Sequence, residues 1–156
     1  MTKTNTLLGF LVFFSFLLIG YLSFYLIIKQ HFSQEEEITP KPLNGEVLEI
    51  LVNEYRRKNN YQPLVHDERL CLLAKVRAVE ANTEWSHDNF FVWSEVWMEK
   101  YPYTLMGENL ARQFATEVDT LRGWLKSEKH KLNIDYPYTT SCIACFNKVC
   151  AQIFGK

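Results

Sequence analysis

The feature that most restricts this chain is an unbroken apolar segment at residues 7–28. The segment has 22 residues and no charged side chain, so a helix rising about 1.5 Å per residue would make it roughly 33 Å long. The hydrocarbon core of a bilayer is about 30 Å thick. We therefore predict a transmembrane signal anchor over residues 7–28, preceded by a cytoplasmic lead at residues 1–6.

Two other interpretations of this segment are weaker. A cleavable signal peptide has a shorter apolar region that ends at a small-x-small site, whereas Lys29 and Gln30 follow this segment directly. A buried core helix would carry polar residues at helical spacing, and the polar residues here are two serines and two tyrosines. The protein would be secreted only if the segment were cleaved.

The cysteines and the short N-terminal lead predict that the rest of the chain lies on the extracellular or periplasmic side. All four cysteines follow the apolar segment, which suits an oxidising compartment. A short, slightly basic lead containing Lys3 is typically retained in the cytoplasm.

Without Lys3 and Lys29, 15 of the 17 basic side chains remain against 18 acidic ones. The resulting formal charge of −3 argues against a nucleic-acid partner.

A spacer and one domain are predicted after the anchor. Residues 29–44 include Pro40, Pro42 and three successive glutamates, a composition typical of a stiff juxtamembrane spacer. Residues 45–156 are long enough for one ordinary domain. Caps and helical periodicity predict four helices in that domain. The first two run from the N-cap Asn44 to Asn59 and from the N-cap Asp67 to about Asn82. The third covers the aromatic residues 90–98 and ends at Tyr101-Pro102, and the fourth runs from Thr116 to about Lys129. The aromatic helix is expected to contribute to the core.

The C-terminal part is predicted to be a β-hairpin. Residues 141–154 form two strand-like runs around Asn147 and Lys148, which can make a two-residue turn. Helices followed by a terminal hairpin favour an α+β fold over an alternating parallel one. With this turn, Cys145 and Cys150 lie opposite each other and can form a disulfide.

The other two cysteines, Cys71 and Cys142, would then link a helix to a strand. Two alternatives use the same residues. Cys142, Cys145 and Cys150 could form a structural zinc site, or Cys142 and Cys145 could form a redox pair.

Candidate residues for chemistry are distant in the sequence. The chain has no HExxH motif, EF-hand loop, paired CxxC, phosphate-binding glycine loop or GxSxG elbow. The candidates are His87, Glu108 and His130. Serines near the two histidines, Ser86 and Ser127, also allow a nucleophilic serine, whereas His31 and His66 are expected to be solvent-exposed.

The order of several short motifs resembles bacterial members of the CAP superfamily, which includes cysteine-rich secretory proteins, antigen 5 and plant pathogenesis-related proteins of class 1. The resemblance covers about residues 45–155. Its motifs are Asn53 and Arg56, Leu70-x3-Ala74-x2-Arg77, Ser86-His87, Gly107-Glu108-Asn109-Leu110-Ala111, Trp124-x2-Ser127-x2-His130-x2-Asn133-Ile134 and Gln152-x-Phe154-Gly155.

This resemblance implies a CAP-type α-β-α sandwich with a central cleft, in which two histidines and one or two glutamates bind zinc or another divalent ion in some members. By motif position these residues are His87, His130 and Glu108. Ser127 occupies the position of the second glutamate, and Glu128 is a doubtful substitute because it points about 100° away on a helix. Without a metal, the same residues would form a hydrogen-bonded network that organises a polar cleft.

Three functions are compatible with these residues. The first is a membrane-anchored binding module for a lipid, glycan, peptide or protein, with an aromatic surface that includes Trp93, Trp97, Tyr101 and Tyr103. The alternative is a metal-assisted, peptidase-like hydrolase in which His87, Glu108 and His130 are the catalytic candidates. A third is a structural surface protein with no small ligand.

Overall fold

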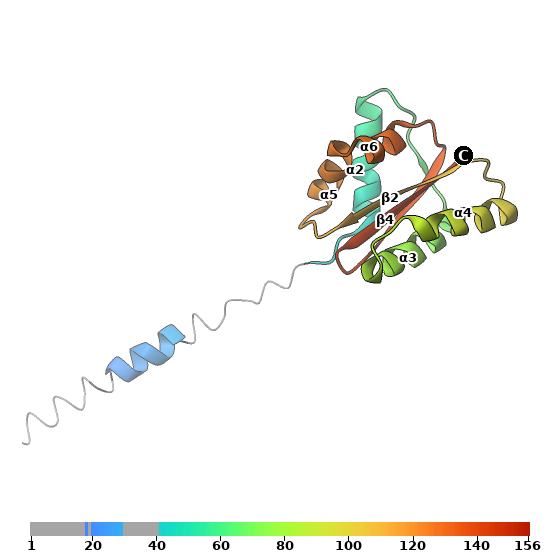
Figure 1. Cartoon of the computed structure of the whole chain (residues 1–156). Coiled ribbons are helices and arrows are strands. Elements are labelled where there is room, and N and C mark those ends of the chain that lie inside the picture. The colour runs from blue at the N-terminus through green and yellow to red at the C-terminus, as the bar shows by residue number, and fades with distance from the viewer. Residues whose placement is uncertain (1–17, 19, 30–40) are drawn as a thin grey trace, which may run out of the picture. The chain divides into compact units, whose positions relative to one another are not determined.

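A computed structural model describes Leu18, residues 20–29 and residues 41–156 (Figure 1). The chain divides into two units, Met1–Thr39 and Pro40–Lys156. The predicted lead, most of the predicted anchor and spacer, and His31 lie outside the described residues. Residues 20–29 are helical. Among the helices of the described ranges, none is long and apolar enough to cross a membrane.

The first two helices of the second unit begin at the predicted caps. Helix α2 is Gly45–Lys58, and the side chain of Asn44 accepts hydrogen bonds from the first turn. Helix α3 is Glu68–Thr83, capped by Asp67. In both cases the cap oxygen satisfies amides that have no partner within the helix. The predicted starts of both helices are therefore confirmed.

The next three helices differ from prediction in part. Helix α4, Asp88–Lys100, is present and contributes Phe90 to the core as expected, whereas its neighbour Phe91 is 64% exposed. The single helix predicted from Thr116 is two helices, α5 (Glu117–Lys126) and α6 (Glu128–Asp135). The backbone of Ser127 is extended, at φ −87° and ψ 116°, which changes the direction of the chain between them.

The sheet contains four strands in the order β1-β3-β4-β2. They are β1 Val65–His66, β2 Met106–Arg112, β3 Thr140–Phe146 and β4 Val149–Gly155. Strand β1 is parallel to β3, and the other pairs are antiparallel. The predicted hairpin is confirmed, with Asn147 in the left-handed region at φ 53°, a conformation that asparagine tolerates better than most residues. The prediction lacked β1 and β2.

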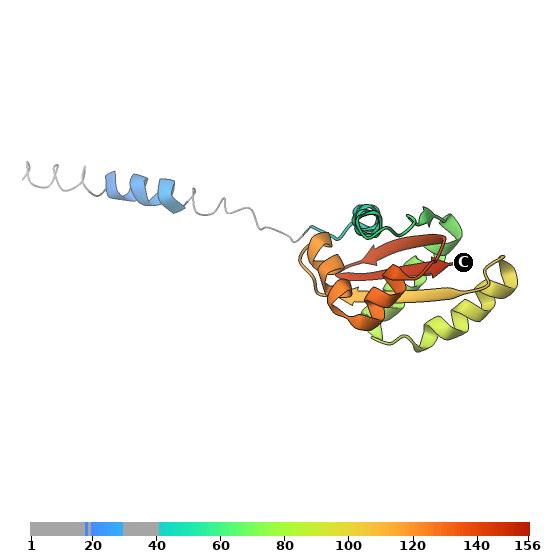
Figure 2. The same ribbon diagram turned by 90° about the horizontal axis from the view of Figure 1, so that it is seen from above.

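Helices cover both faces of this sheet, as Figures 1 and 2 show. On one face, Leu48 of α2 and Trp124 of α5 belong to one core cluster. On the other, Leu73 of α3 and Phe90 of α4 belong to a second cluster. Neighbouring strand residues alternate between the clusters, as expected for side chains of period two. The α+β class is confirmed, and the sheet lies between two helical layers.

Both predicted disulfides are present. Cys71–Cys142 joins α3 to β3, and Cys145–Cys150 joins directly opposite residues of the hairpin. The alternatives of a zinc site or a redox pair at Cys142 and Cys145 are therefore wrong. These two residues are three positions apart on one strand, so their side chains point to opposite faces of the sheet.

Candidate functional site

The structure brings together His87, Glu108 and His130 from three separate elements. Glu108 lies within β2, His87 immediately precedes α4, and His130 lies in α6. Nδ1 of His87 is 2.8 Å from Oε1 of Glu108. The rings of His87 and His130 are tilted by 50°, with their centroids 6.0 Å apart. The three residues thus form one polar cluster.

A buried arginine holds Glu108 in place. The side chains of Arg77 and Glu108 are each 1% exposed. Nε of Arg77 donates to Oε2 of Glu108 at 2.7 Å, and Nη2 donates to Oε1 at 3.3 Å. A carboxylate buried this deeply needs a charged partner, because the cost of desolvation is otherwise prohibitive. Sequence reasoning gave Arg77 no role, although an arginine on the apolar face of α3 was the available signal.

Arg77 also fixes the segment that leads to His87. Its Nη1 donates to Oε2 of Glu80 at 2.5 Å, and its Nη2 donates to the carbonyl of Ser86 at 2.6 Å. Burial acts to lower the pKa of Arg77, but the hydrogen bonds and charges of Glu108 and Glu80 outweigh it and raise that pKa above its ordinary value. The guanidinium therefore stays charged and holds β2, α3 and the start of α4 together.

The two histidines have different environments. The side chain of His87 is 45% exposed. Because a carboxylate oxygen can only accept a hydrogen bond, Nδ1 of His87 carries the hydrogen that is donated to Glu108. Burial lowers the pKa of His130, the nearby His87 lowers it further, and Glu108 offsets part of that effect. His130 is therefore neutral near pH 7 and keeps one ring nitrogen as an acceptor.

These residues line a cleft of about 410 Å³. One wall is apolar and aromatic, and polar groups lie beside it. The lining residues are His87, Phe90, Phe91, Met106, Gly107, Glu108, Lys129, His130, Asn133 and Tyr138. A cleft of this volume, mainly apolar with a few fixed polar groups, is typical of small-molecule sites.

Two asparagines attach α6 to β2 and so position His130. Nδ2 of Asn133 donates to the carbonyl of Glu108 at 3.0 Å and to Oδ1 of Asn109 at 2.9 Å. Nδ2 of Asn109 in turn donates to the carbonyl of His130 at 3.0 Å. Sequence reasoning quoted both asparagines only as motif positions. Their amides bond to backbone groups of distant segments, which spacing in the sequence does not reveal.

Gly107 is required by a close approach beside this network. A Cβ atom there would overlap the hydroxyl of Tyr138, which lines the cleft. A glycine lets Tyr138 pack directly against β2.

Other candidate residues do not join the cleft. Glu128 is exposed in the first turn of α6 and is not among the lining residues, whereas the next residue, Lys129, is. Oγ of Ser86 accepts a hydrogen bond from the amide of Asp88 at 2.9 Å, so it supports the start of α4. Ser127 connects α5 to α6. The side chain of His66 is 44% exposed, in line with prediction, but it has its own set of partners at the other edge of the sheet.

The predicted aromatic surface is only partly a surface. Trp93, Trp97 and Tyr101 are partly buried against the core cluster of α3 and α4. Tyr103 is only 7% exposed, and its hydroxyl donates to Oδ2 of Asp67 at 2.7 Å. The assignment of Tyr103 to an exposed surface was therefore wrong, because its hydroxyl has a buried acceptor.

A divalent metal in this cleft would be held by the two histidines, whose ring centroids are 6.0 Å apart, rather than by Glu108. In the part of the chain that the structure describes, His87, Glu108 and His130 are not a group of three whose ligand atoms all lie within 4.8 Å of one another. Arg77 and His87 already engage both oxygens of Glu108. A carboxylate that orients a histidine through its second nitrogen is a common outer partner of metal sites. Glu108 fits that role.

Comparisons with known proteins identify the family and the fold of this chain. The model of the cysteine-rich secretory protein family, CAP, matches residues 50–152. No curated protein matches the chain. An extracellular protein containing an SCP domain from Bacillus anthracis is 26% identical, with a TM-score of 0.63, over 72% of this chain and 40% of that one.

Two further solved structures share the fold. A cysteine-rich secretory protein from Staphylococcus aureus is 17% identical, with a TM-score of 0.63, over 70% of this chain and 36% of that one. An outer surface protein from Borrelia burgdorferi is 23% identical, with a TM-score of 0.64, over 71% of this chain and 90% of that one. The chain spans less than half the length of the Bacillus and Staphylococcus proteins. Because the family model matches most of the chain, over the segment that carries the histidine–glutamate cluster, the protein belongs to the CAP family.

Proposed function

We propose that this protein is an exported, membrane-tethered binding domain whose cleft takes a ligand with both an apolar part and a polar group. The observation that carries this proposal is the engagement of Glu108 by Arg77 and His87. The polar groups of the cleft are fixed before any ligand arrives. Such preorganisation favours binding, because little conformational freedom remains to be lost.

The aromatic wall supports a ligand with an apolar part. Phe91 lines the cleft and is 64% exposed, so a ligand there would remove a large ring from water. Lys129, His87 and His130 provide charge and hydrogen bonds on the polar side. The ligand classes compatible with this lining are lipids, glycans and peptides that carry an apolar group.

The ligand proposal can be tested with two neighbouring residues of α4. Phe91 and Val92 are each 64% exposed, but only Phe91 lines the cleft. Calorimetry with the full chain in detergent, against a panel of lipids, glycans and peptides, should find a ligand whose affinity falls about 10-fold in Phe91→Ala. Val92→Ala should leave that affinity unchanged. Equal losses in both variants, or no ligand in any class, would contradict the proposal.

A hydrolase is the weaker alternative for this cleft. Glu108 would have to take a proton from water, yet both of its oxygens accept hydrogen bonds from Arg77 and His87, and it is buried. Turnover of peptide or ester substrates should therefore be absent. Metal-dependent turnover that disappears in Glu108→Gln would establish the hydrolase instead.

Divalent metal binding is a further property that we propose for the two histidines. Nε2 of His87 and a ring nitrogen of His130 would hold the ion, with Glu108 orienting His87. A bound ion would supply a Lewis acid for a ligand oxygen. Calorimetric titration with Zn²⁺ should show binding that His87→Ala weakens at least about 10-fold. Equal binding by both proteins would exclude this site.

Export and tethering rest on the apolar segment at residues 7–28 and on the relatives described as extracellular or outer surface proteins. We expect the full chain to fractionate with membranes and to be cleaved by protease added outside the cell. Mass spectrometry of the membrane fraction should find the N-terminal segment still attached. A secreted chain that begins after residue 28 would show that the segment is a cleaved signal peptide.

A further inference from the structure

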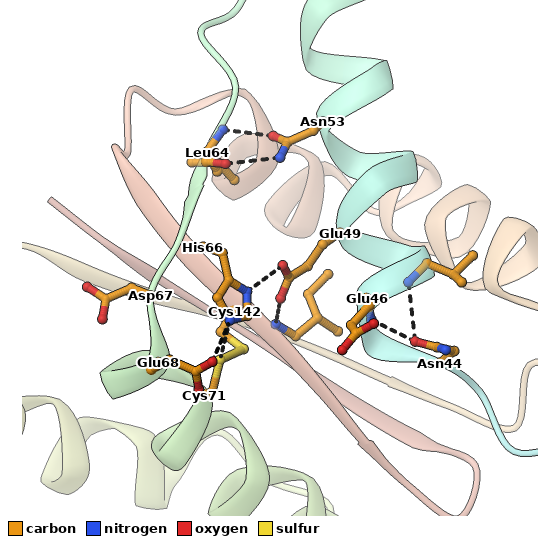
Figure 3. Close-up of polar contacts among 12 residues, drawn as sticks. Asn44, Glu46, Glu49, Asn53, Leu64, His66, Asp67, Glu68, Cys71 and Cys142 are labelled. Atoms are coloured by element: carbon orange, nitrogen blue, oxygen red, sulfur yellow. Dashed lines mark hydrogen bonds and ion pairs between the residues drawn. A yellow bond between two sulfur atoms is a disulfide. The ribbon is translucent and has the colours of Figure 1, made fainter.

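A second polar cluster lies at the edge of the sheet opposite to the strand that carries Glu108. It contains His66 of β1, Cys71 of α3 and Cys142 of β3, with Glu49 of α2 and Glu68 of α3 beside them (Figure 3). The cluster plays no part in the cleft described above. It brings a histidine and two carboxylates next to a disulfide bond.

The ring of His66 is held in one orientation. Its Nδ1 is 2.8 Å from Oε2 of Glu49, and Oε1 of Glu49 accepts a hydrogen bond from the amide of Ile143 at 2.7 Å. Since the carboxylate only accepts, Nδ1 carries the hydrogen of this contact. Nε2 is then the nitrogen that faces Sγ of Cys71 and Oε1 of Glu68, each at 3.3 Å.

This arrangement places three potential metal ligands close together. The ligand atoms of His66, Cys71 and Cys142 all lie within 4.8 Å of one another, and no other such group of three occurs among the described residues. In a tetrahedral zinc site each ligand atom lies about 2.0 to 2.3 Å from the ion, so any two ligand atoms are also less than 4.8 Å apart. The disulfide, however, occupies both sulfurs, so only the reduced protein can offer them to an ion.

We propose that reduction of the Cys71–Cys142 disulfide converts this cluster into a site for a zinc-class divalent ion. The ligands are Nε2 of His66 and the two sulfurs, which leaves the fourth position of a tetrahedral ion open. Two molecules of a thiol reductant supply two electrons and two protons, which break the S–S bond and give two thiols, and the reductant becomes a disulfide. The ion then displaces both thiol protons and any proton on Nε2.

Glu49 is the outer partner of this site, because it orients His66 through the nitrogen that does not bind the ion. The ion can enter beside the imidazole, since the side chain of His66 is 44% exposed while both sulfurs belong to buried residues. Bound metal would preserve the link between α3 and β3 that the disulfide provides in the oxidised protein. The site is therefore an alternative cross-link for reducing conditions.

The test uses Co²⁺ as a probe, because thiolate ligands give it a charge-transfer absorption. The full chain is studied in detergent with Cys145→Ser and Cys150→Ser, so that Cys71 and Cys142 are its remaining cysteines. After reduction by a phosphine, Co²⁺ should bind with this absorption, and the oxidised chain should not show it. His66→Ala and Glu49→Gln should each weaken binding about 10-fold or more.

The matched control is Glu46→Gln, which makes the same change on the exposed first turn of α2 and should leave Co²⁺ affinity unchanged. Three results would overturn the proposal: no charge-transfer absorption in the reduced chain, the same affinity in His66→Ala, or the same absorption in a chain that also carries Cys71→Ser and Cys142→Ser. If reduction unfolds the chain, recovery of its far-ultraviolet circular dichroism on adding Co²⁺ supports the site, and failure to recover overturns it.

Discussion

Two buried arginines, Arg56 and Arg77, show two ways in which this protein satisfies a charge in its core. Arg77 faces the carboxylates of Glu108 and Glu80. Arg56 is 1% exposed and instead donates to backbone carbonyls, including those of Gln62 and Tyr136. Burial lowers the pKa of Arg56, with carboxylate and tyrosine charges opposing the effect. Arg56, whose partners are backbone carbonyls, mainly orders the loops that carry those carbonyls. The Arg77–Glu108 ion pair, in addition, determines the charge of the cleft.

Loss of Arg77 should destabilise the fold strongly. Arg77→Met leaves Glu108 charged and buried without its partner, and we expect a loss of about 3 to 5 kcal/mol in the free energy of unfolding. Urea denaturation near neutral pH measures this loss. Adding Glu108→Gln to the variant removes the unpaired charge and should restore part of the stability. A double variant no more stable than Arg77→Met would contradict this account.

Asp67 should make stability depend on pH in the acid range. Hydrogen bonds from Arg69, and then from Tyr103, lower the pKa of Asp67 from its ordinary value of 3.8 to about 2, against the opposing effect of burial. The folded protein therefore binds this proton more weakly than the unfolded chain does. The resulting stabilisation of the folded state is about 1 to 2 kcal/mol, after allowing for the half-exposed Arg69. It is complete above about pH 4 and is lost as the pH falls through about 2.

The matched variant for this prediction is Asp67→Asn, because asparagine is also a good N-cap for α3 but has no titrating carboxyl. Urea midpoints measured from about pH 5 down to about pH 2 should fall more steeply for the unmodified chain than for the variant. Parallel curves for the two proteins would show that Asp67 is not responsible for the acid sensitivity.

At the scale of elements, the cleft depends on how α6 is attached to β2. The segment Met106–Arg112 is a strand because it pairs along its length with β4, although it contains a glycine, a glutamate and an asparagine, which have low strand propensity. The side chains of Asn109 and Asn133 then join this strand to α6. Both the strand and the helix position are therefore products of contacts between distant segments.

Asn133→Ala should loosen α6 without affecting the other helices to the same extent. The variant removes the donor to the carbonyl of Glu108, a buried residue, and we expect a cost of about 1 to 3 kcal/mol. Hydrogen exchange should become faster for the amides of α6 and remain unchanged for those of α2. Uniformly faster exchange throughout the domain would instead indicate global destabilisation and contradict a local role.

At the scale of the whole domain, the two disulfides have unequal reach. Cys71–Cys142 spans a separation of 71 residues and joins a helical layer to the sheet. Cys145–Cys150 spans 5 residues within a hairpin that its turn already closes. A cross-link stabilises mainly by restricting the unfolded chain, and the restriction grows with the length of the loop.

The longer cross-link should therefore contribute more to stability. Replacing both Cys71 and Cys142 by serine should cost about 4 kcal/mol, and the same change at Cys145 and Cys150 about 2 kcal/mol, by the loop-entropy relation. Thermal or urea denaturation of the two double variants under oxidising conditions measures the difference. The reverse order would show that strain or packing, rather than loop length, determines the effect.

Local sequence signals predicted a substantial part of the fold. The caps Asn44 and Asp67 and the periodicity after them located α2 and α3, and the turn at Asn147 located the hairpin and its disulfide. Motif order identified the three polar residues that the fold brings together. These features were predictable because each depends on residues close together in the chain or on an ordered set of motifs.

The sequence by itself determined where most elements begin, favoured the cysteine pairing that the structure has, and indicated which polar residues form the cleft. Only the tertiary structure decided that β2 is a strand, that the chain turns at Ser127 to form two helices, and that Arg77 neutralises Glu108. It also placed Tyr103 in the core and His66 beside the Cys71–Cys142 disulfide. The physical reason is that pairing partners, buried charges and hydrogen-bond acceptors belong to segments far apart in sequence, and only folding brings them into contact.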